Sequence, residues 1–295
     1  MRAAADERSV VALLREGARL LRTAAVESPR LEAEVLLRTA LGLPERSHLY
    51  LAPGEPVARD AERRYFEMLR RRVSGEPLAY VVGEKEFFSL SFLVGDAVLI
   101  PRPATEHVVE AAVEWCRRRR WSGPATALDV GTGSGCVAVA LAAGEPRLRV
   151  TAVDVSGEAL RVAKENVRRH RLASRVRLIR CDLVSAVDPR RRFDLIVSNP
   201  PYVTSAEYER LPSEVRREPR AALLAGDDGL LFYRRIFREA LPLLAPDGLL
   251  VLELNPNTAA EVLSLAREAG LACEIRKDYS GADRVLLARR GVAER

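Results

Sequence analysis

The sequence predicts a small helical domain followed by an α/β domain with a doubly wound sheet. Residues 1 to about 75 carry apolar side chains at helical spacing, interrupted by proline and glycine clusters. From about residue 104, short apolar runs alternate with helix-length segments, the pattern of parallel strands covered on both faces. The length of 295 residues suits two domains.

The helical domain is expected from three groups of apolar residues separated by helix breakers. The breakers are Ser28-Pro29, Gly42-Leu43-Pro44 and the segment 53–56. The expected apolar faces lie within residues 10–21, 31–37 and 65–69. Residues 76–103 are expected to form a linker, in which apolar residues between Glu86 and Ile100, interrupted by Gly95-Asp96, predict a β-hairpin.

The α/β domain is expected over residues 104–295. Six apolar runs predict strands near residues 127–130, 150–153, 176–179, 194–197, 249–252 and 285–288. Four intervening segments predict helices near residues 135–143, 156–170, 229–244 and 258–269.

Composition limits the function classes. Hydrophobic residues make up 48% of the chain and charged residues 30%, as in ordinary globular proteins. No apolar run approaches the ~18–20 residues of a membrane span, and the N-terminal residues do not resemble a signal peptide, so we expect a cytoplasmic protein. Four cysteines and three histidines show no zinc-site spacing, so no metal is expected. The net charge of +6 permits an acidic partner. Almost all of the positively charged residues are arginines, which compositional bias also explains.

A glycine-rich loop, Asp129-Val130-Gly131-Thr132-Gly133-Ser134-Gly135, follows the first predicted strand and opens a helix. In open α/β sheets the ligand binds at this place. The third glycine comes one residue too early for the dinucleotide fingerprint, and no Walker lysine follows. The loop instead resembles that of S-adenosylmethionine-dependent methyltransferases, in which Asp129 would lie near the methionine end of the cofactor.

Two further acids follow predicted strands. Asp154 closes the second strand, where a carboxylate can accept hydrogen bonds from a ribose diol, although a helix N-cap is the competing interpretation. Asp182 follows the third strand, where it could meet the adenine amine or simply form a turn. Leu183 could supply an apolar wall for the ring.

The tetrapeptide Asn199-Pro200-Pro201-Tyr202 follows the fourth predicted strand. It should face the same crevice as the glycine loop, because the two follow neighbouring strands at a topological switch. Adjacent prolines hold a rigid row of carbonyls, Asn199 adds a side-chain acceptor and Tyr202 an aromatic face. We expect a receptor for a planar NH₂ group, which would hold the nitrogen within ~3–3.5 Å of a transferable methyl. Asn199, Pro200 and Tyr202 are the predicted catalytic residues.

Together these motifs resemble the release factor glutamine methyltransferases of the PrmC/HemK type. The order and spacing of the matching stretches carry the resemblance: residues 75–80, 83–87, 99–106, the glycine loop, 198–202, 215–223 and 228–230.

The resemblance implies a class I, Rossmann-like methyltransferase domain behind a helical substrate-binding domain. The implied cofactor is S-adenosyl-L-methionine, leaving S-adenosyl-L-homocysteine, and the implied substrate is the glutamine of a Gly-Gly-Gln motif in class I release factors. Cofactor binding would fall to Asp129, Gly131, Thr132, Gly133, Ser134, Gly135, Asp154, Asp182, Leu183 and Asn199. Substrate binding would fall to the tetrapeptide, Pro201 included, with Arg102, Thr105 and Glu106 shaping the pocket. Ala104 and the Leu254-Asn255-Pro256 turn depart from the family pattern.

Three alternatives remain at this level. The tetrapeptide also serves adenine amino-methyltransferases acting on RNA or DNA, although an aromatic content of 5% is low for base capture. The same chemistry could act on a ribosomal-protein glutamine, against which the form of the Ile-Pro-Arg-Pro stretch argues. A non-catalytic binding subunit is disfavoured by the intact Asn199 and glycine loop.

Overall fold

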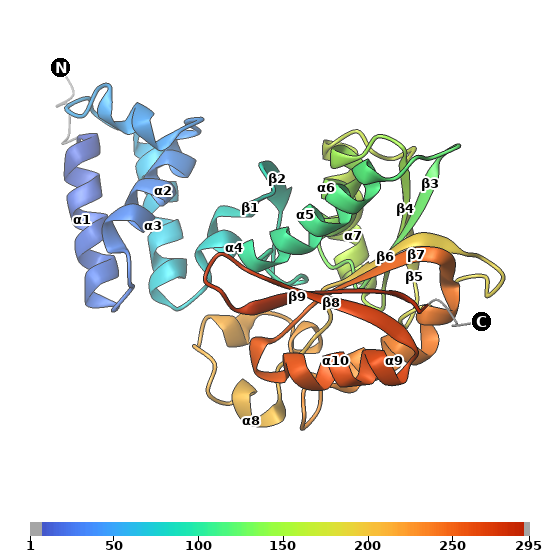
Figure 1. Ribbon diagram of the computed structural model, residues 1–295. Coiled ribbons are helices and arrows are strands. Elements are labelled where there is room, and N and C mark those ends of the chain that lie inside the picture. Colours follow the sequence, from blue (N-terminus) through green and yellow to red (C-terminus); the bar gives the residue numbers. More distant parts are fainter. Residues whose placement is uncertain (1–7, 292–295) are drawn as a thin grey trace, which may run out of the picture. The chain divides into compact units, whose positions relative to one another are not determined.

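The structure is a computed structural model that describes residues 8–291, and it divides into two compact units (Figure 1). The smaller unit continues through Gly83 and also includes Ser213–Arg217; the larger one comprises Glu84–Pro212 and the chain from Glu218 onward. The boundary expected at residue 75 therefore falls within the smaller unit, and the outer limits expected at residues 1 and 295 lie outside the described residues.

The smaller unit is helical. Its helices are α1 (Val10–Thr23), α2 (Pro29–Leu41), a 3₁₀ helix (Arg46–Tyr50), α3 (Arg59–Val73) and α4 (Leu78–Val82). The helices α1, α2 and α3 pack on one another around buried leucines and Tyr65. The Tyr65 ring lies against Gly17, where an added Cβ would stand 1.8 Å from the tyrosine oxygen. Residues Ser213–Arg217 are attached to the helices of this unit through Arg72, which forms ion pairs with both Glu32 and Glu214.

The larger unit contains a seven-stranded sheet in the order β5-β4-β3-β6-β7-β9-β8. Its strands are β3 (Ala125–Val130), β4 (Leu148–Asp154), β5 (Val176–Arg180), β6 (Phe193–Ser198), β7 (Leu244–Glu253), β8 (Leu271–Lys277) and β9 (Asp283–Arg290). The strands β3 to β7 are parallel, as expected, whereas β9 runs antiparallel to both β7 and β8. Sequence patterning missed β8 because this edge strand is half exposed and carries no continuous apolar run.

Helices cover both faces of this sheet (Figure 1). One apolar core gathers residues of α5, α6 and α7, and the other gathers residues of α9 and α10. The bounds are α5 (Pro103–Arg118), α6 (Cys136–Gly144), α7 (Gly157–Arg169), α8 (Ser205–Tyr208), α9 (Leu231–Glu239) and α10 (Ala259–Glu268), with 3₁₀ helices at Val215–Arg217, Arg220–Ala222, Leu241–Leu243 and Pro256–Thr258. In the described chain, no helix has the length and apolar character needed to cross a membrane.

A two-stranded hairpin, β1 (Glu84–Phe87) and β2 (Leu90–Leu93), precedes α5. It is shorter than the hairpin expected over residues 86–100, since Val98–Ile100 form no strand. The hairpin belongs to the larger unit, in which Asn166 of α7 bonds both the amide and the carbonyl of Leu93.

Candidate active site

A cleft of about 390 Å³ opens at the carboxyl ends of β3, β4 and β6. Both motifs contribute to it, since Gly131, Gly133, Asn199, Pro200 and Pro201 line its wall. Because β3 lies between β4 and β6, the chain reverses its winding direction here, and such switch points are where doubly wound sheets bind ligands.

The glycine loop brings bare backbone to the cleft. Gly131 and Gly133 have φ values of 75° and 55°, which only glycine adopts without strain. A Cβ added at either position would meet no atom within 4 Å, so the space above the loop is open to a ligand. At Gly135, by contrast, an added Cβ would stand 3.1 Å from Ala163, so this glycine permits helix packing rather than ligand approach.

Three predicted cofactor residues of the loop lie beneath it instead of lining the cleft. Asp129, Thr132 and Ser134 are almost completely buried. The Thr132 hydroxyl donates a 2.6 Å hydrogen bond to Asp129. Burial raises the Asp129 pKa to about 7, partly opposed by the Thr132 bond and reinforced by the charge of Asp154. The position of Asp129 therefore suits it to hold the loop in shape.

Asp154 lines the cleft and organises the loop opposite it. One carboxylate oxygen accepts the Gly133 amide at 2.8 Å, and the other accepts the Ser156 amide at 2.9 Å. The N-cap of α7 is Ser156, whose side chain accepts from Ala159, so the N-cap interpretation of Asp154 is wrong. A carboxylate has acceptor capacity beyond two bonds, which leaves Asp154 able to accept from a ribose.

Asp182 and Leu183 also line the cleft. Both Asp182 oxygens are 3.0 Å from the guanidinium of Arg235 on α9. Leu183 adopts a φ of 49° and packs on the core beneath α9. An ion-paired acid beside an apolar side chain is an arrangement that can border a flat heterocycle.

Asn199 is held by a residue far away in the sequence. Its side-chain nitrogen donates a 3.0 Å hydrogen bond to the Thr105 hydroxyl on α5. The neighbouring Ser198 hydroxyl donates to the Val130 carbonyl at 2.7 Å and so ties β6 to β3 where the two motifs begin. With its NH₂ group engaged, Asn199 offers its carbonyl oxygen as the acceptor.

Glu253, at the end of β7, extends this network beneath the cleft. It is fully buried, accepts the Tyr202 hydroxyl at 3.4 Å, and also accepts a hydrogen bond from Thr105. Burial raises its pKa to about 6, against the opposing influence of Thr105 and the positive charge of Arg284. Burial raises the pKa of Tyr202 as well, so this phenol stays protonated. Tyr202 itself is not among the residues that line the cleft.

Arg102 and Glu106 stand behind the cleft wall. Arg102 forms an ion pair with the buried Glu218, which also accepts the Ile100 amide at 2.9 Å. Glu106 accepts the Phe88 amide at 2.9 Å and so supports the hairpin turn. Neither side chain lines the cleft, in contrast to the substrate contact expected for them.

Comparison with known proteins shows the family of this chain. The family models described as "PrmC N-terminal domain" and "Methyltransferase small domain" match residues 12–83 and 121–226. The release factor glutamine methyltransferase of Nitratidesulfovibrio vulgaris is 43% identical over 286 residues, covering 96% of this chain and 95% of that protein. The chain belongs to the release factor glutamine methyltransferase family. A second family member, from Moorella thermoacetica, is 45% identical and covers 94% and 97% of the two chains.

A solved methyltransferase from Pyrococcus furiosus is similar in fold, with a TM-score of 0.51 and 21% identity over 77% of this chain and 99% of that one. The fold class predicted from the sequence, a class I methyltransferase domain with a helical N-terminal domain, is confirmed.

The cleft fits the cofactor that methyltransferases of this family use. Open backbone at Gly131 and Gly133, a carboxylate with spare acceptor capacity at Asp154 and an apolar wall suit a molecule that combines an amino acid, a ribose and a purine. Among the described residues, no group of three or more His, Cys, Asp or Glu side chains could hold a metal ion.

Sequence reasoning missed part of this family member's cleft. Many of the missed residues come from the loop before α5, the 3₁₀ turn at Arg220–Ala222 and α9: Ala97, Val98, Leu99, Pro219, Ala221, Ala222, Phe232, Arg235 and Ile236. Apart from Arg235, these side chains are small or apolar and carry no chemical signature. Glu253, Glu218 and Arg235 are charged, but only packing places their partners beside them.

Proposed function

We propose that this chain transfers a methyl group from S-adenosyl-L-methionine to the side-chain amide nitrogen of the glutamine in the Gly-Gly-Gln motif of class I release factors. The observation that carries this proposal is the fixed amide of Asn199. Its NH₂ group is committed to Thr105, and its carbonyl oxygen is left as an acceptor at the cleft wall. An NH₂ group is the substrate part that such an acceptor selects.

The residues divide the work by position. Gly131, Gly133 and Asp154 would hold the cofactor, with Asp182 and Leu183 bordering its base. When bound, the cofactor supplies an activated methyl on a positively charged sulfur. Asn199 Oδ1 and the Pro200 carbonyl would each accept a hydrogen bond from one N–H group of the substrate amide. These two hydrogen bonds would direct the amide nitrogen at that methyl.

As the N–C bond forms, the bond between the methyl and the sulfur breaks with its electron pair left on the sulfur, and charge balance then requires the nitrogen to lose one proton. The amide lone pair is delocalised, so the receptor must hold the nitrogen in a reactive orientation instead of removing a proton first. After transfer the nitrogen is strongly acidic, and its proton can leave to water. The buried Glu253 would contribute indirectly, by holding Tyr202 and Thr105.

Incubation with a full-length release factor and labelled cofactor, followed by mass spectrometry of the Gly-Gly-Gln peptide, tests the proposal. One added methyl on the glutamine is expected, and none on a matched substrate with asparagine in its place. Methyl on adenine of an RNA, or only on a ribosomal protein, would replace the proposed substrate with one of the alternatives. Methyl on no substrate would favour the non-catalytic reading.

The helical unit is proposed to contact the protein substrate. Leu51 is 78% exposed and Tyr50 46% exposed, and both lie at the end of its 3₁₀ helix. Leu51→Ser should raise KM for the full-length release factor several-fold and leave KM for a short Gly-Gly-Gln peptide unchanged. A matched change at a polar exposed position, Arg63→Ser, should alter neither value. Equal KM values for Leu51→Ser and wild type on the full-length substrate would refute the contact.

The proposal includes a cytosolic location. The four cysteines are free thiols, three of them buried, as suits a reducing compartment.

A further inference from the structure

The end of the sheet opposite the cleft, where the parallel strands begin, carries a continuous basic surface. Four neighbouring hollows run from the strands β8 and β9 along the amino ends of the parallel strands, and adjacent hollows share lining residues. Arg119 is shared by the first and second, Arg147 by the second and third, and Arg149 by the third and fourth. We call this surface the arginine band.

The band is strongly one-sided in charge. Of the described residues, eleven arginines but only two carboxylates, Glu145 and Glu274, line the four hollows. Such an excess concentrates positive potential and attracts polyanions. The substrate cleft lies at the other ends of the same strands, so the proposed function does not use these arginines.

Most of these guanidinium groups are not neutralised. In the described chain, Arg147, Arg177 and Arg191 are exposed and have no ion-pair partner. Arg117 and Arg175 donate only to backbone carbonyls at the end of α6. Guanidinium groups that carry full charge at a surface with few carboxylates are suited to bind phosphates, because they present several donors in a planar fork.

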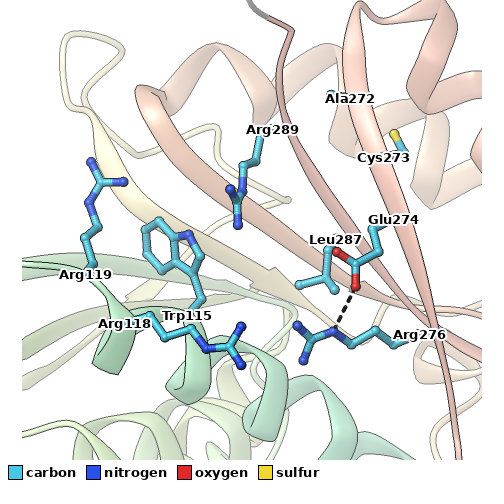
Figure 2. Close-up of a pocket in the computed structure, with 9 residues that line it drawn as sticks. All are labelled: Trp115, Arg118, Arg119, Ala272, Cys273, Glu274, Arg276, Leu287 and Arg289. Carbon is cyan, nitrogen blue, oxygen red and sulfur yellow. Dashed lines mark hydrogen bonds and ion pairs between the residues drawn. The ribbon is translucent and has the colours of Figure 1, made fainter.

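The first hollow adds aromatic surface to this charge. It has a volume of about 470 Å³ and lies between the end of α5 and the strands β8 and β9. Figure 2 shows the Trp115 indole among the side chains of Arg118, Arg119 and Arg289. In the described residues no carboxylate pairs with Arg289. Arg118, Arg119 and Arg276 pair with carboxylates that are half-buried (Glu114) or exposed (Asp247 and Glu274), and such pairs contribute little and can be exchanged for phosphate.

Two half-buried indole rings, which meet edge to face at 75°, and a guanidinium group connect the first two hollows. The rings of Trp115 and Trp121 lie 5.6 Å apart at their centroids, and the Arg119 guanidinium is 5.2 and 5.3 Å from the two centroids. Flat aromatic and guanidinium surfaces beside a row of cations are the combination with which proteins hold unpaired bases and their phosphates. An acidic polypeptide would use the charges but not the rings.

We propose that the arginine band binds single-stranded nucleic acid, with phosphates on the strand-end arginines and a base stacked at Trp115, Trp121 and Arg119. The six-residue strand β3 separates the band from the cleft by ~20 Å, so binding leaves the active site accessible. The proposed ligand is a second partner rather than the methyl acceptor. A test of nucleic-acid binding by the band is therefore independent of a test of methyl transfer.

The chain provides its own probe. Both of its tryptophans, Trp115 and Trp121, lie in the band, so tryptophan emission reports on this surface alone. Titration of the whole protein with an oligo(U) of about 12 nucleotides should quench this emission. The same titration with oligo(dT) distinguishes the source: tighter oligo(U) binding assigns RNA, and equal binding assigns the chemistry shared by both.

Charge removal tests the phosphate contacts. A variant with four substitutions, Arg147→Gln, Arg149→Gln, Arg177→Gln and Arg191→Gln, should bind roughly tenfold or more weakly than wild type. The slope of log K against the logarithm of the salt concentration should become shallower by about three. The matched control replaces four exposed arginines outside the band by glutamine: Arg161, Arg168, Arg171 and Arg210. The control should bind nearly as wild type does, and both variants should keep wild-type methyl transfer to a short Gly-Gly-Gln peptide.

Three results would overturn the proposal. One is the absence of salt-dependent binding by the wild-type protein. Another is equal weakening in the band variant and the control, which would mean attraction to net charge alone. The third is displacement of oligo(U) by poly-L-glutamate at equal charge concentration, which would assign the band to acidic protein.

Discussion

The two ends of the central sheet, where the parallel strands begin and where they end, are built from the same strands. They differ in the burial, pairing and charge of their side chains. At the carboxyl edge, a few side chains are buried, each with specific partners, and the pKa values of Asp129 and Glu253 are raised by burial. At the amino edge, many like-charged side chains are exposed and few are paired. The difference teaches that a reaction site depends on individual positions, whereas a charged surface depends on the sum of its charges.

The largest effect is expected from Asn199→Ala, which removes the acceptor proposed to orient the substrate amide. We expect kcat for a Gly-Gly-Gln peptide to fall roughly a thousandfold, because positioning of the reacting nitrogen is lost. Cofactor affinity measured by calorimetry should stay within a few-fold of wild type. Unchanged kcat would break the comparison, since the carboxyl edge would then tolerate loss of a single position as the amino edge does.

A second effect concerns the buried carboxyl of Asp129. Its folded-state pKa of about 7 lies above the ordinary value of 3.8, so the folded chain holds a proton that the unfolded chain releases between those pH values. The free energy of unfolding therefore loses on the order of 3 kcal/mol from this group as the pH rises from 4 to 7.

Asp129→Asn keeps an acceptor for Thr132 but cannot titrate. Urea unfolding at several pH values should show the variant gaining stability relative to wild type as the pH rises from 4 to 7. Ser156→Ala, which removes the N-cap of α7, is a useful control because it should lower stability by about 1 kcal/mol at every pH. Parallel curves for wild type and Asp129→Asn would show that Asp129 is not buried as a neutral acid.

A smaller effect separates positioning from direct contact. Thr105→Val removes the hydroxyl that accepts from Asn199, so the amide can turn its NH₂ group toward the substrate. We expect kcat to fall roughly tenfold with KM nearly unchanged. Thr105→Ser, which retains the hydroxyl, should restore most of kcat. Equal activity of the valine and serine variants would remove Thr105 from the site.

The smallest effect is expected at the amino edge. Arg149→Gln should change the free energy of unfolding by less than about 0.5 kcal/mol, since the side chain is exposed and only one 3.4 Å bond to the Ser174 carbonyl is lost. Methyl transfer should not change. A large loss of stability from this single substitution would show that Arg149 is needed for the fold. The band would then not be a surface on which each charge contributes independently.

Much of the fold was predictable because it is encoded locally. The parallel strands β3 to β7 were recognised from continuous apolar runs, and the glycine loop and Asn-Pro-Pro-Tyr from residues adjacent in sequence. Prediction failed where the apolar pattern did not match burial in a strand. In β8 only Leu271 is buried and the other residues are half-buried or exposed, whereas Val98 and Leu99 are apolar side chains that line the cleft and form no strand.

The sequence by itself determined the two-domain organisation, the fold class and the two motifs at the cleft, since each follows from short-range spacing and from residues with special backbone properties. Only the tertiary structure placed Thr105 on Asn199, Glu253 under Tyr202, and Glu218 behind Arg102. It alone gathered arginines from several loops and strand ends into one band. The physical reason is that these contacts join residues distant in sequence, and their distances depend on how helices and strands pack rather than on local conformational preference.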